Sequence, residues 1–217
     1  GGNTNATAEH SLSLLMSLYR NIPDANLGTH KGLWEKKKFK GMELKGKKIG
    51  IIGFGNVGKR FSEIAIALGM NVAVYSKSFI SRKNDYPNIE NISFNDLIIK
   101  SDILSFHCKP SKDGKPIISI KELRLMKKNA VIINTARGNL IEEIDLKEAL
   151  DNDIIRGAAL DVFSEEPAKN NILFGTKNLI LTPHIAASTI EAQLVVAEQI
   201  ALQISNYFNN NEIINSL

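Results

Sequence analysis

Short apolar runs recur along the chain, each bounded by turn-forming or polar residues. They show no alternation of apolar and polar positions, which is typical of strands buried on both faces of a parallel sheet. The runs that we interpret as strands are KIGII (48–52), NVAVY (71–75), ILSFH (103–107), AVIIN (130–134), GAALDV (157–162) and LILT (179–182).

Between most of these runs, apolar residues recur at three- and four-residue spacing, which indicates helices with one buried face. Strands and helices that alternate in this way predict an α/β fold built on a doubly wound parallel sheet. The two helical stripes that are most evident comprise Val57, Phe61, Ile64, Ala65 and Leu68, and then Leu146, Ala149 and Leu150.

Two longer helices are predicted to flank this core, in the segments at about 1–20 and 189–208. Either apolar face could pack on the sheet or on another subunit. The residues that define the two faces are Ala8, Leu12, Leu15 and Tyr19 in the first helix, and Ile190, Leu194, Ala197, Ala201, Ile204 and Phe208 in the second.

Composition narrows the class of protein. The 217 residues are 43% hydrophobic, which is enough to bury the core of one domain. A net charge of +4 is compatible with anionic ligands, including small phosphorylated metabolites. Cys108 is the single cysteine, so an intrachain disulfide and a cysteine-based zinc cluster are excluded, which favours a reducing compartment.

The N-terminal residues show neither a basic nor an apolar secretion-signal region, and no run reaches the ~18 apolar residues of a membrane span. We therefore expect a cytoplasmic protein that binds no membrane and no metal. Residues 31–48 form a basic connector. Because its only aromatic residues are Trp34 and Phe39, we do not expect it to bind nucleic acid.

A glycine loop follows the first predicted strand. KKIGIIGFGNVGKRF places Gly53, Gly55 and Gly58 between that strand and the start of a helix. The first glycine permits a tight turn, the second lets a pyrophosphate approach the backbone, and the third lets helix and strand pack closely. Free N–H groups at the helix N-terminus then attract phosphate. These glycines could form a merely structural turn, but their order with strand and helix predicts a Rossmann-type dinucleotide-binding domain.

An acidic residue is missing where such a domain usually binds the ribose of NAD, about 20 residues further on. The position falls at Ser76, after NVAVY, and is followed by Lys77. A serine does not repel the 2′-phosphate of NADP, and a lysine could pair with it. The cofactor is therefore NAD with NADP as a possibility, and a solvated Lys77 beside a tolerated Ser76 is the alternative interpretation.

Three further motifs follow predicted strands at the sheet edge where such folds bind ligands: INTARGNLIEE (133–143), AALDVFSEEP (158–167) and LTPHIAASTIEAQ (181–193). Arg137 can pair with a carboxylate, His184 can exchange a proton with a carbonyl oxygen, and Glu166 can fix the histidine tautomer. Each residue alone also has a structural explanation, but together beside a glycine loop they predict hydride transfer to or from a 2-keto or 2-hydroxy acid.

With these motifs, nearly the whole chain resembles the D-isomer-specific 2-hydroxyacid dehydrogenases, from GGNT and AEH to TPHIAASTIEAQ. Within the family, STIEAQ after the histidine is typical of the branch that oxidises D-3-phosphoglycerate in serine biosynthesis. The resemblance implies that Arg137, Glu166 and His184 are catalytic. The cofactor-binding residues that it implies, together with those from the loop, are Gly53, Gly55, Asn56, Val57, Gly58, Ser76, Lys77, Cys108, Thr135, Ala136, Arg137, Asp161, His184, Ala186 and Ala187.

Family members begin about a hundred residues earlier, with a substrate domain. We therefore expect residues 1–217 to form the dinucleotide-binding domain, with the N-terminal part of the substrate domain missing and catalysis by this chain alone in doubt. The resemblance also implies a homodimer or larger homo-oligomer, with Trp34 reaching the neighbouring subunit. Alternatives that remain open are an NADPH-dependent glyoxylate or hydroxypyruvate reductase and a non-enzymatic NAD(H)-sensing scaffold of the corepressor type.

Overall fold

The fold is known from a computed structural model that describes residues 2–77 and 79–210. Residues 1, 78 and 211–217 of the predicted domain lie outside this description. Within the described residues, one seven-stranded sheet has the order β3-β2-β1-β4-β5-β6-β7, and every pairing is parallel. The strands are β1 (Lys48–Ile52), β2 (Asn71–Tyr75), β3 (Ile89–Asn91), β4 (Ile103–Phe106), β5 (Val131–Asn134), β6 (Gly157–Leu160) and β7 (Leu179–Leu181).

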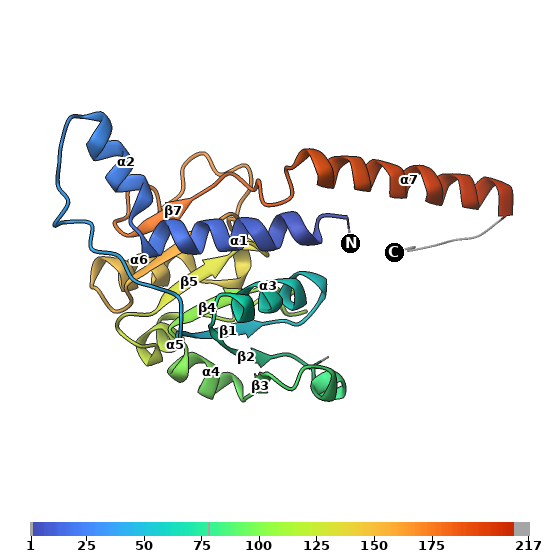
Figure 1. Cartoon of the computed structure of the whole chain (residues 1–217), viewed down its shortest axis with the longest axis horizontal. Helices are drawn as coiled ribbons and strands as arrows, with labels where there is room; N and C mark the ends of the chain where they lie inside the picture. The colour runs from blue at the N-terminus through green and yellow to red at the C-terminus, as the bar shows by residue number, and fades with distance from the viewer. Residues whose placement is uncertain (1, 78, 211–217) are drawn as a thin grey trace.

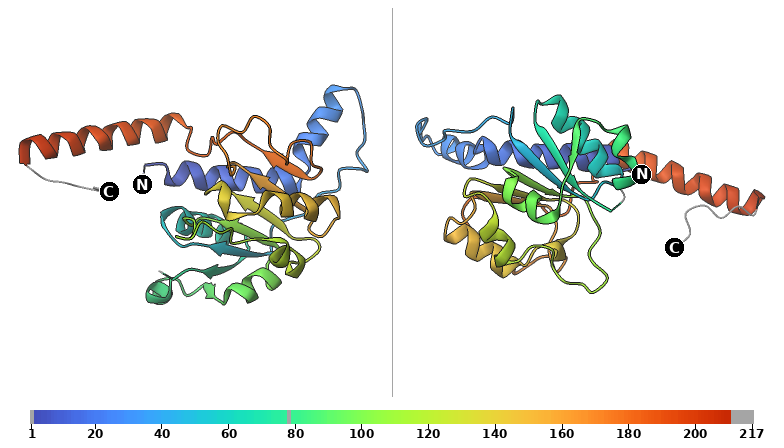
Figure 2. Two further views of the ribbon diagram at one scale, coloured as in Figure 1. Left: turned by 180° about the vertical axis from the view of Figure 1, so that it is seen from behind. Right: turned by 90° about the horizontal axis from the view of Figure 1, so that it is seen from below.

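Helices cover both faces of this sheet (Figures 1 and 2). On one face, α1 and α3 pack on the strands and on each other, and the core beneath them includes Leu15 and Phe61. On the other face, α4, α5 and α6 enclose a second core that includes Leu97 and Leu146. The helices are α1 (Thr4–Tyr19), α2 (Ile22–His30), α3 (Asn56–Ala67), α4 (Phe94–Lys100), α5 (Ile120–Leu125), α6 (Glu143–Asp151) and α7 (Ile190–Asn210), with 3₁₀ turns at Ile80–Asp85 and Gly138–Leu140.

The strand order reverses between β1 and β4, which lie next to each other in the sheet. The chain leaves β1 toward α3 on one face and leaves β4 toward α5 on the other. In open parallel sheets, this divergence opens a crevice at the carboxyl ends of the strands, where ligands bind. The doubly wound parallel sheet predicted from the sequence is therefore confirmed, and the glycine loop lies at its crevice.

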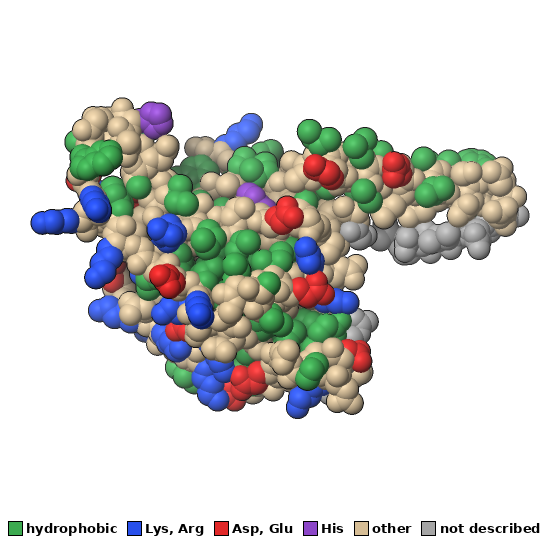
Figure 3. All heavy atoms as spheres, viewed as in Figure 1, with side chains coloured by type: hydrophobic (Ala, Val, Ile, Leu, Met, Phe, Trp, Pro, Cys, Tyr) green, Lys and Arg blue, Asp and Glu red, His purple; other side chains and the backbone are tan. Residues whose placement is uncertain are grey.

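Helix α7 extends away from the sheet, past the N-terminal end of α1 (Figures 1 and 2). Among its described residues only Ala192 is buried. Ile190 is 76% exposed and Phe208 is 77% exposed, so the predicted apolar face does not pack on the sheet. Figure 3 shows hydrophobic side chains along α7, which projects from the body of the protein. No described helix, α7 included, is both long and apolar enough to cross a bilayer.

Candidate functional site

The turn after β1 requires glycine at two positions. Gly53 has a φ of +95°, and a Cβ there would lie 2.5 Å from the carbonyl oxygen of His107. At Gly58, in the first turn of α3, a Cβ would lie 2.2 Å from the carbonyl oxygen of Gly53. By contrast, a Cβ at Gly55 would meet nothing within 4 Å. The first and third glycines therefore shape the loop, whereas the second faces open space from which a pyrophosphate could approach.

This open space belongs to a cavity of about 380 Å³ at the crevice. Gly55 is the N-cap of α3, so the cavity contains the N-terminus of a helix. Backbone N–H groups at a helix N-terminus can bind the phosphates of a dinucleotide. The predicted cofactor-binding residues that line it are Gly55, Val57, Cys108, Thr135, Ala136, Arg137, His184, Ala186 and Ala187. Four segments that are far apart in the sequence therefore meet where the motifs predicted a single site.

Ser76 and Lys77 follow β2 beside the glycine loop. The N–H of Gly53 donates to the carbonyl oxygen of Tyr75 at 3.0 Å, which fixes the end of β2 against the turn. Ser76 is half-buried and Lys77 is exposed. Neither residue lines the 380 Å³ cavity, and neither does Asn56, which begins α3.

The cavity also has walls that the sequence analysis missed, formed by Thr7, His107 and Lys109. His107 and Lys109 flank the predicted Cys108, so their position after β4 was the signal that could have identified them. Burial lowers the pKa of His107 to about 3, and Ser105 Oγ lies 2.9 Å from its Nε2. Burial raises the pKa of Cys108 to about 11. Both side chains are therefore neutral at pH 7.

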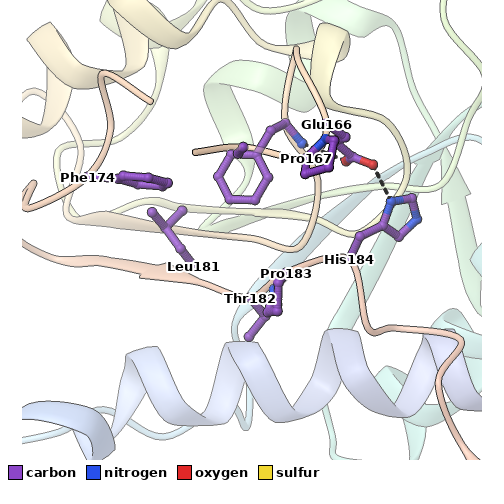
Figure 4. A pocket seen from close by; sticks show the side chains of 9 residues that line it. Glu166, Pro167, Phe174, Leu181, Thr182, Pro183 and His184 are labelled. Atoms are coloured by element: carbon purple, nitrogen blue, oxygen red, sulfur yellow. Dashed lines mark hydrogen bonds and ion pairs between the residues drawn. The ribbon is translucent and has the colours of Figure 1, made fainter. Parts of the chain in front are cut away.

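His184 and Glu166 form a close hydrogen-bonded pair at the cavity. Nδ1 of His184 lies 2.6 Å from Oε2 of Glu166 (Figure 4). Oε1 of the same carboxylate accepts the N–H of Phe163 at 3.0 Å. Burial alone would raise the pKa of Glu166, but the hydrogen bonds from His184 and Phe163 outweigh it and hold the pKa below its usual value. An ionised Glu166 thus orients the ring and leaves Nε2 for proton exchange.

Arg137 also lines the cavity, three residues after the end of β5. The turn that carries it is fixed by Asn134, whose side chain accepts the N–H of Ala136 at 3.0 Å and donates to the carbonyl of Arg137 at 2.9 Å. The guanidinium of Arg137 is exposed and donates to the carbonyl of Ala136 at 2.6 Å. A cation and an imidazole therefore line one cavity, as the binding and protonation of a keto acid would require.

Asp161 lies behind the cavity wall. Its carboxylate is fully buried and accepts the N–H of Ile185 at 2.9 Å and that of Ala186 at 2.8 Å. Burial would raise the pKa of Asp161, but hydrogen bonds from His10, Thr182 and these two amides lower it. Asp161 therefore holds the loop after β7, and its predicted role in cofactor binding stays a prediction.

A second cavity, of about 550 Å³, reaches the other side of the His184 and Glu166 pair. Figure 4 shows Phe174, Leu181 and Pro183 around it, with the carboxylate and the imidazole at one margin. This largely apolar space was not predicted, because most of its walls come from the loops after β6 and β7, which have no periodic pattern.

Comparison with known proteins identifies the family of the chain. The model of a family described as "D-isomer specific 2-hydroxyacid dehydrogenase, NAD binding domain" matches residues 12–186. D-3-phosphoglycerate dehydrogenase of Archaeoglobus fulgidus is 39% identical over 207 residues, which are 95% of this chain and 39% of that protein. Glyoxylate reductase of Thermococcus litoralis is 38% identical over 205 residues, which are 91% of this chain and 62% of that protein.

Among solved structures, an acyclic imino acid reductase (Bsp5) in complex with NADPH and D-Arg superposes with a TM-score of 0.90 at 35% identity. The match covers 100% of this chain and 68% of that one. By contrast, the chain spans only about 39% of the length of the D-3-phosphoglycerate dehydrogenase of Archaeoglobus fulgidus.

Proposed function

Because the chain belongs to the D-isomer-specific 2-hydroxyacid dehydrogenase family, of which it contains the NAD-binding domain, we propose that it serves hydride transfer between a nicotinamide cofactor and a D-2-hydroxy acid. When bound, the cofactor supplies or takes up the hydride. The observation that carries the proposal is the His184 and Glu166 pair, 2.6 Å apart, at the cavity that the glycine loop and Arg137 also line.

Each of the three catalytic residues has a distinct role in this proposal. Arg137 pairs with the substrate carboxylate and polarises the adjacent carbonyl. His184 donates a proton to the carbonyl oxygen during reduction and accepts it during oxidation. Glu166 stabilises the protonated ring and keeps Nδ1 as the bonded nitrogen. Replacement of His184 by alanine should therefore lower turnover by ~10²–10⁴-fold while cofactor binding persists.

The proposed reaction is the oxidation of D-3-phosphoglycerate to 3-phosphohydroxypyruvate in serine biosynthesis, in the cytoplasm. Support comes from the STIEAQ motif and from relatives of that name in several organisms. The glyoxylate reductase at 38% identity supports reduction of a small unphosphorylated keto acid as the second candidate. Rates with phosphohydroxypyruvate, hydroxypyruvate and glyoxylate, in a version that carries the substrate domain, would discriminate between the two.

A third candidate, the NAD(H)-sensing scaffold, makes a different prediction for His184. If the protein is a scaffold, no turnover accompanies cofactor binding, and partner proteins are gained or lost with cofactor. Turnover that disappears in His184→Ala would exclude this candidate.

We further propose self-association, because the Trp34 side chain is 87% exposed on the connector, where a second copy could cover it.

The experiment that tests the proposal first is a calorimetric titration of the purified chain with NADH and with NADPH. Binding of either one in the micromolar range is the expected result, since the glycine loop and cavity belong wholly to this chain. NADPH bound about tenfold more tightly, a difference of ~1.4 kcal/mol, would favour the reductase. NADH bound as well or better would favour the phosphoglycerate dehydrogenase. Failure of both to bind would contradict the proposed function.

A further inference from the structure

Helix α1 contacts the ends of three neighbouring strands through polar side chains. Ser11 Oγ lies 2.8 Å from Thr135 Oγ1, after β5. His10 Nε2 lies 3.1 Å from Thr182 Oγ1, after β7, and 3.3 Å from Asp161 Oδ1, after β6. Figure 4 shows Thr182 directly above this helix. Two consecutive residues of one helix therefore reach all three strand ends that carry predicted catalytic motifs.

His10 meets a carboxylate that is closed off from solvent, because the Asp161 side chain is 0% exposed. Besides His10, its Oδ1 accepts the hydroxyl of Thr182 at 2.5 Å and the N–H of Ile185 at 2.9 Å. Oδ2 accepts the N–H of Ala186 at 2.8 Å. A buried carboxylate is very costly unless donors surround it, so these donors and the carboxylate hold one another in place.

The hydrogen bonds of Thr182 and Asp161 determine which nitrogen of the His10 ring carries a hydrogen. The Thr182 hydroxyl hydrogen points to Asp161, so its oxygen presents a lone pair to His10. An ionised carboxylate also only accepts hydrogen bonds. Nε2 of His10 must therefore carry a hydrogen, which it directs at Thr182 and Asp161 together.

From this arrangement we propose that His10 is a positioning residue for the cofactor cavity. Its Nε2–H fixes Asp161 and Thr182, and Asp161 fixes the amides of the loop on which His184 and Ala186 line the cavity. His10 itself does not line the cavity, so it acts only through this loop. The effect of this loop on cofactor binding rests on the proposed function. The effect of His10 on the order of the loop does not.

Amide hydrogen exchange followed by NMR tests the link between His10 and the loop in the free chain. In His10→Leu, exchange at Ile185 and Ala186 should accelerate about tenfold, since Asp161 loses a donor. The N–H of Phe163, which Glu166 accepts, should keep its rate. His10→Gln should restore slow exchange, because its amide nitrogen can occupy the place of Nε2. His10→Asn, too short to reach Thr182, should behave like His10→Leu and replaces it if the leucine variant does not fold.

The matched control is His30→Leu, the same change at an exposed position of α2, which should leave both amides unaffected. In the same set of variants, the dissociation constant for NADH should rise about fivefold in His10→Leu and return in His10→Gln. Unchanged exchange at Ile185 and Ala186, or equal acceleration throughout the chain, would overturn the role of His10. Failure of the unaltered chain to bind NADH or NADPH would instead contradict the proposed function.

Discussion

Ser76 is the residue at which cofactor choice is most open to experiment. It follows β2 directly, and the preceding Tyr75 accepts a hydrogen bond from Gly53 of the cofactor loop. Ser76→Asp would place a carboxylate where the family usually has one, and that charge would repel a 2′-phosphate. We expect NADPH to bind at least about tenfold more weakly and NADH to bind equally or more tightly. Calorimetry measures both.

Lys77→Gln is the companion variant, because it removes a cation without adding a repulsive charge. A weaker affinity for NADPH alone would assign Lys77 to the 2′-phosphate. Equal affinities in the two variants and the unaltered chain would mean that the cofactor adenosine lies elsewhere.

Cys108 offers a chemical probe of the cavity. It is the only cysteine, it lines the cavity, and burial raises its pKa to about 11. Since the thiolate is the reactive form, we expect slow alkylation by iodoacetamide at pH 7.5 and a rate that rises about tenfold per pH unit below pH 11. Bound NADH should slow the reaction further by covering the thiol. Fast alkylation at pH 7.5, measured by mass spectrometry, would contradict the buried environment.

Individual site residues were predictable where their strand ends were predictable. Arg137, Glu166 and His184 each follow an apolar run, and the sheet brings these run ends to one edge. The contacts of His10 were not predictable, because they depend on the angle at which α1 crosses the sheet. The same reason applies to Asp161: its sequence position is clear, but the direction of its side chain follows from donors supplied by other segments.

At the scale of elements, different glycines of the loop between β1 and α3 serve stability and cofactor binding. A Cβ at Gly58 would collide with the Gly53 carbonyl at 2.2 Å, whereas a Cβ at Gly55 meets nothing. Gly58→Ala should therefore lower the thermal midpoint by several degrees, in line with a loss of about 1–3 kcal/mol. Gly55→Ala should keep the midpoint and lower the affinity for NADH about tenfold or more, because the methyl group blocks the pyrophosphate. Calorimetry in scanning and titration modes measures the two effects.

The outcome that would contradict this division is equal loss of stability in the two variants. Equal NADH affinity in Gly55→Ala and the unaltered chain would also contradict it, since the cofactor phosphates would then bind away from the loop.

Elements with a strong pattern were predicted, and weak ones were missed. β1 and β2 match their predicted bounds, and β4 to β7 differ at the ends by one or two residues. β3 was missed because it is three residues long and contains Glu90 at the sheet edge. α7 was predicted as a helix, but its sequence pattern does not indicate what covers its apolar face. Within the described residues, the sheet does not cover that face.

At the scale of the whole molecule, the described residues bury two apolar cores, one on either side of the sheet. Their large members, such as Phe61 and Phe106, are at most 1% exposed. The cofactor cavity lies at the carboxyl ends of the strands, outside both cores. The charged and polar side chains that line it therefore do not have to be buried among the apolar core residues. Proton uptake at that edge is nevertheless linked to the stability of the whole fold.

His107 makes this linkage measurable. Burial lowers its pKa from 6.5 to about 3, and its ring packs on Phe61 with centroids 5.1 Å apart. Between these pH values the unfolded chain binds a proton that the folded chain does not, so the free energy of unfolding falls as the pH falls. From pH 7 to pH 5 the loss due to this residue should approach about 2 kcal/mol.

The variant that isolates this contribution is His107→Gln, which can still hydrogen-bond Ser105 but does not titrate. Urea unfolding at pH 7 and pH 5 should show a smaller pH-dependent loss for the variant than for the unaltered chain. The lowered pKa values of Asp161 and Glu166 also remove stability in acid, but they act in both proteins and at lower pH, so they cancel in the difference. An equal loss in the two proteins would mean that His107 is protonated at pH 5 in the folded state and would contradict its lowered pKa.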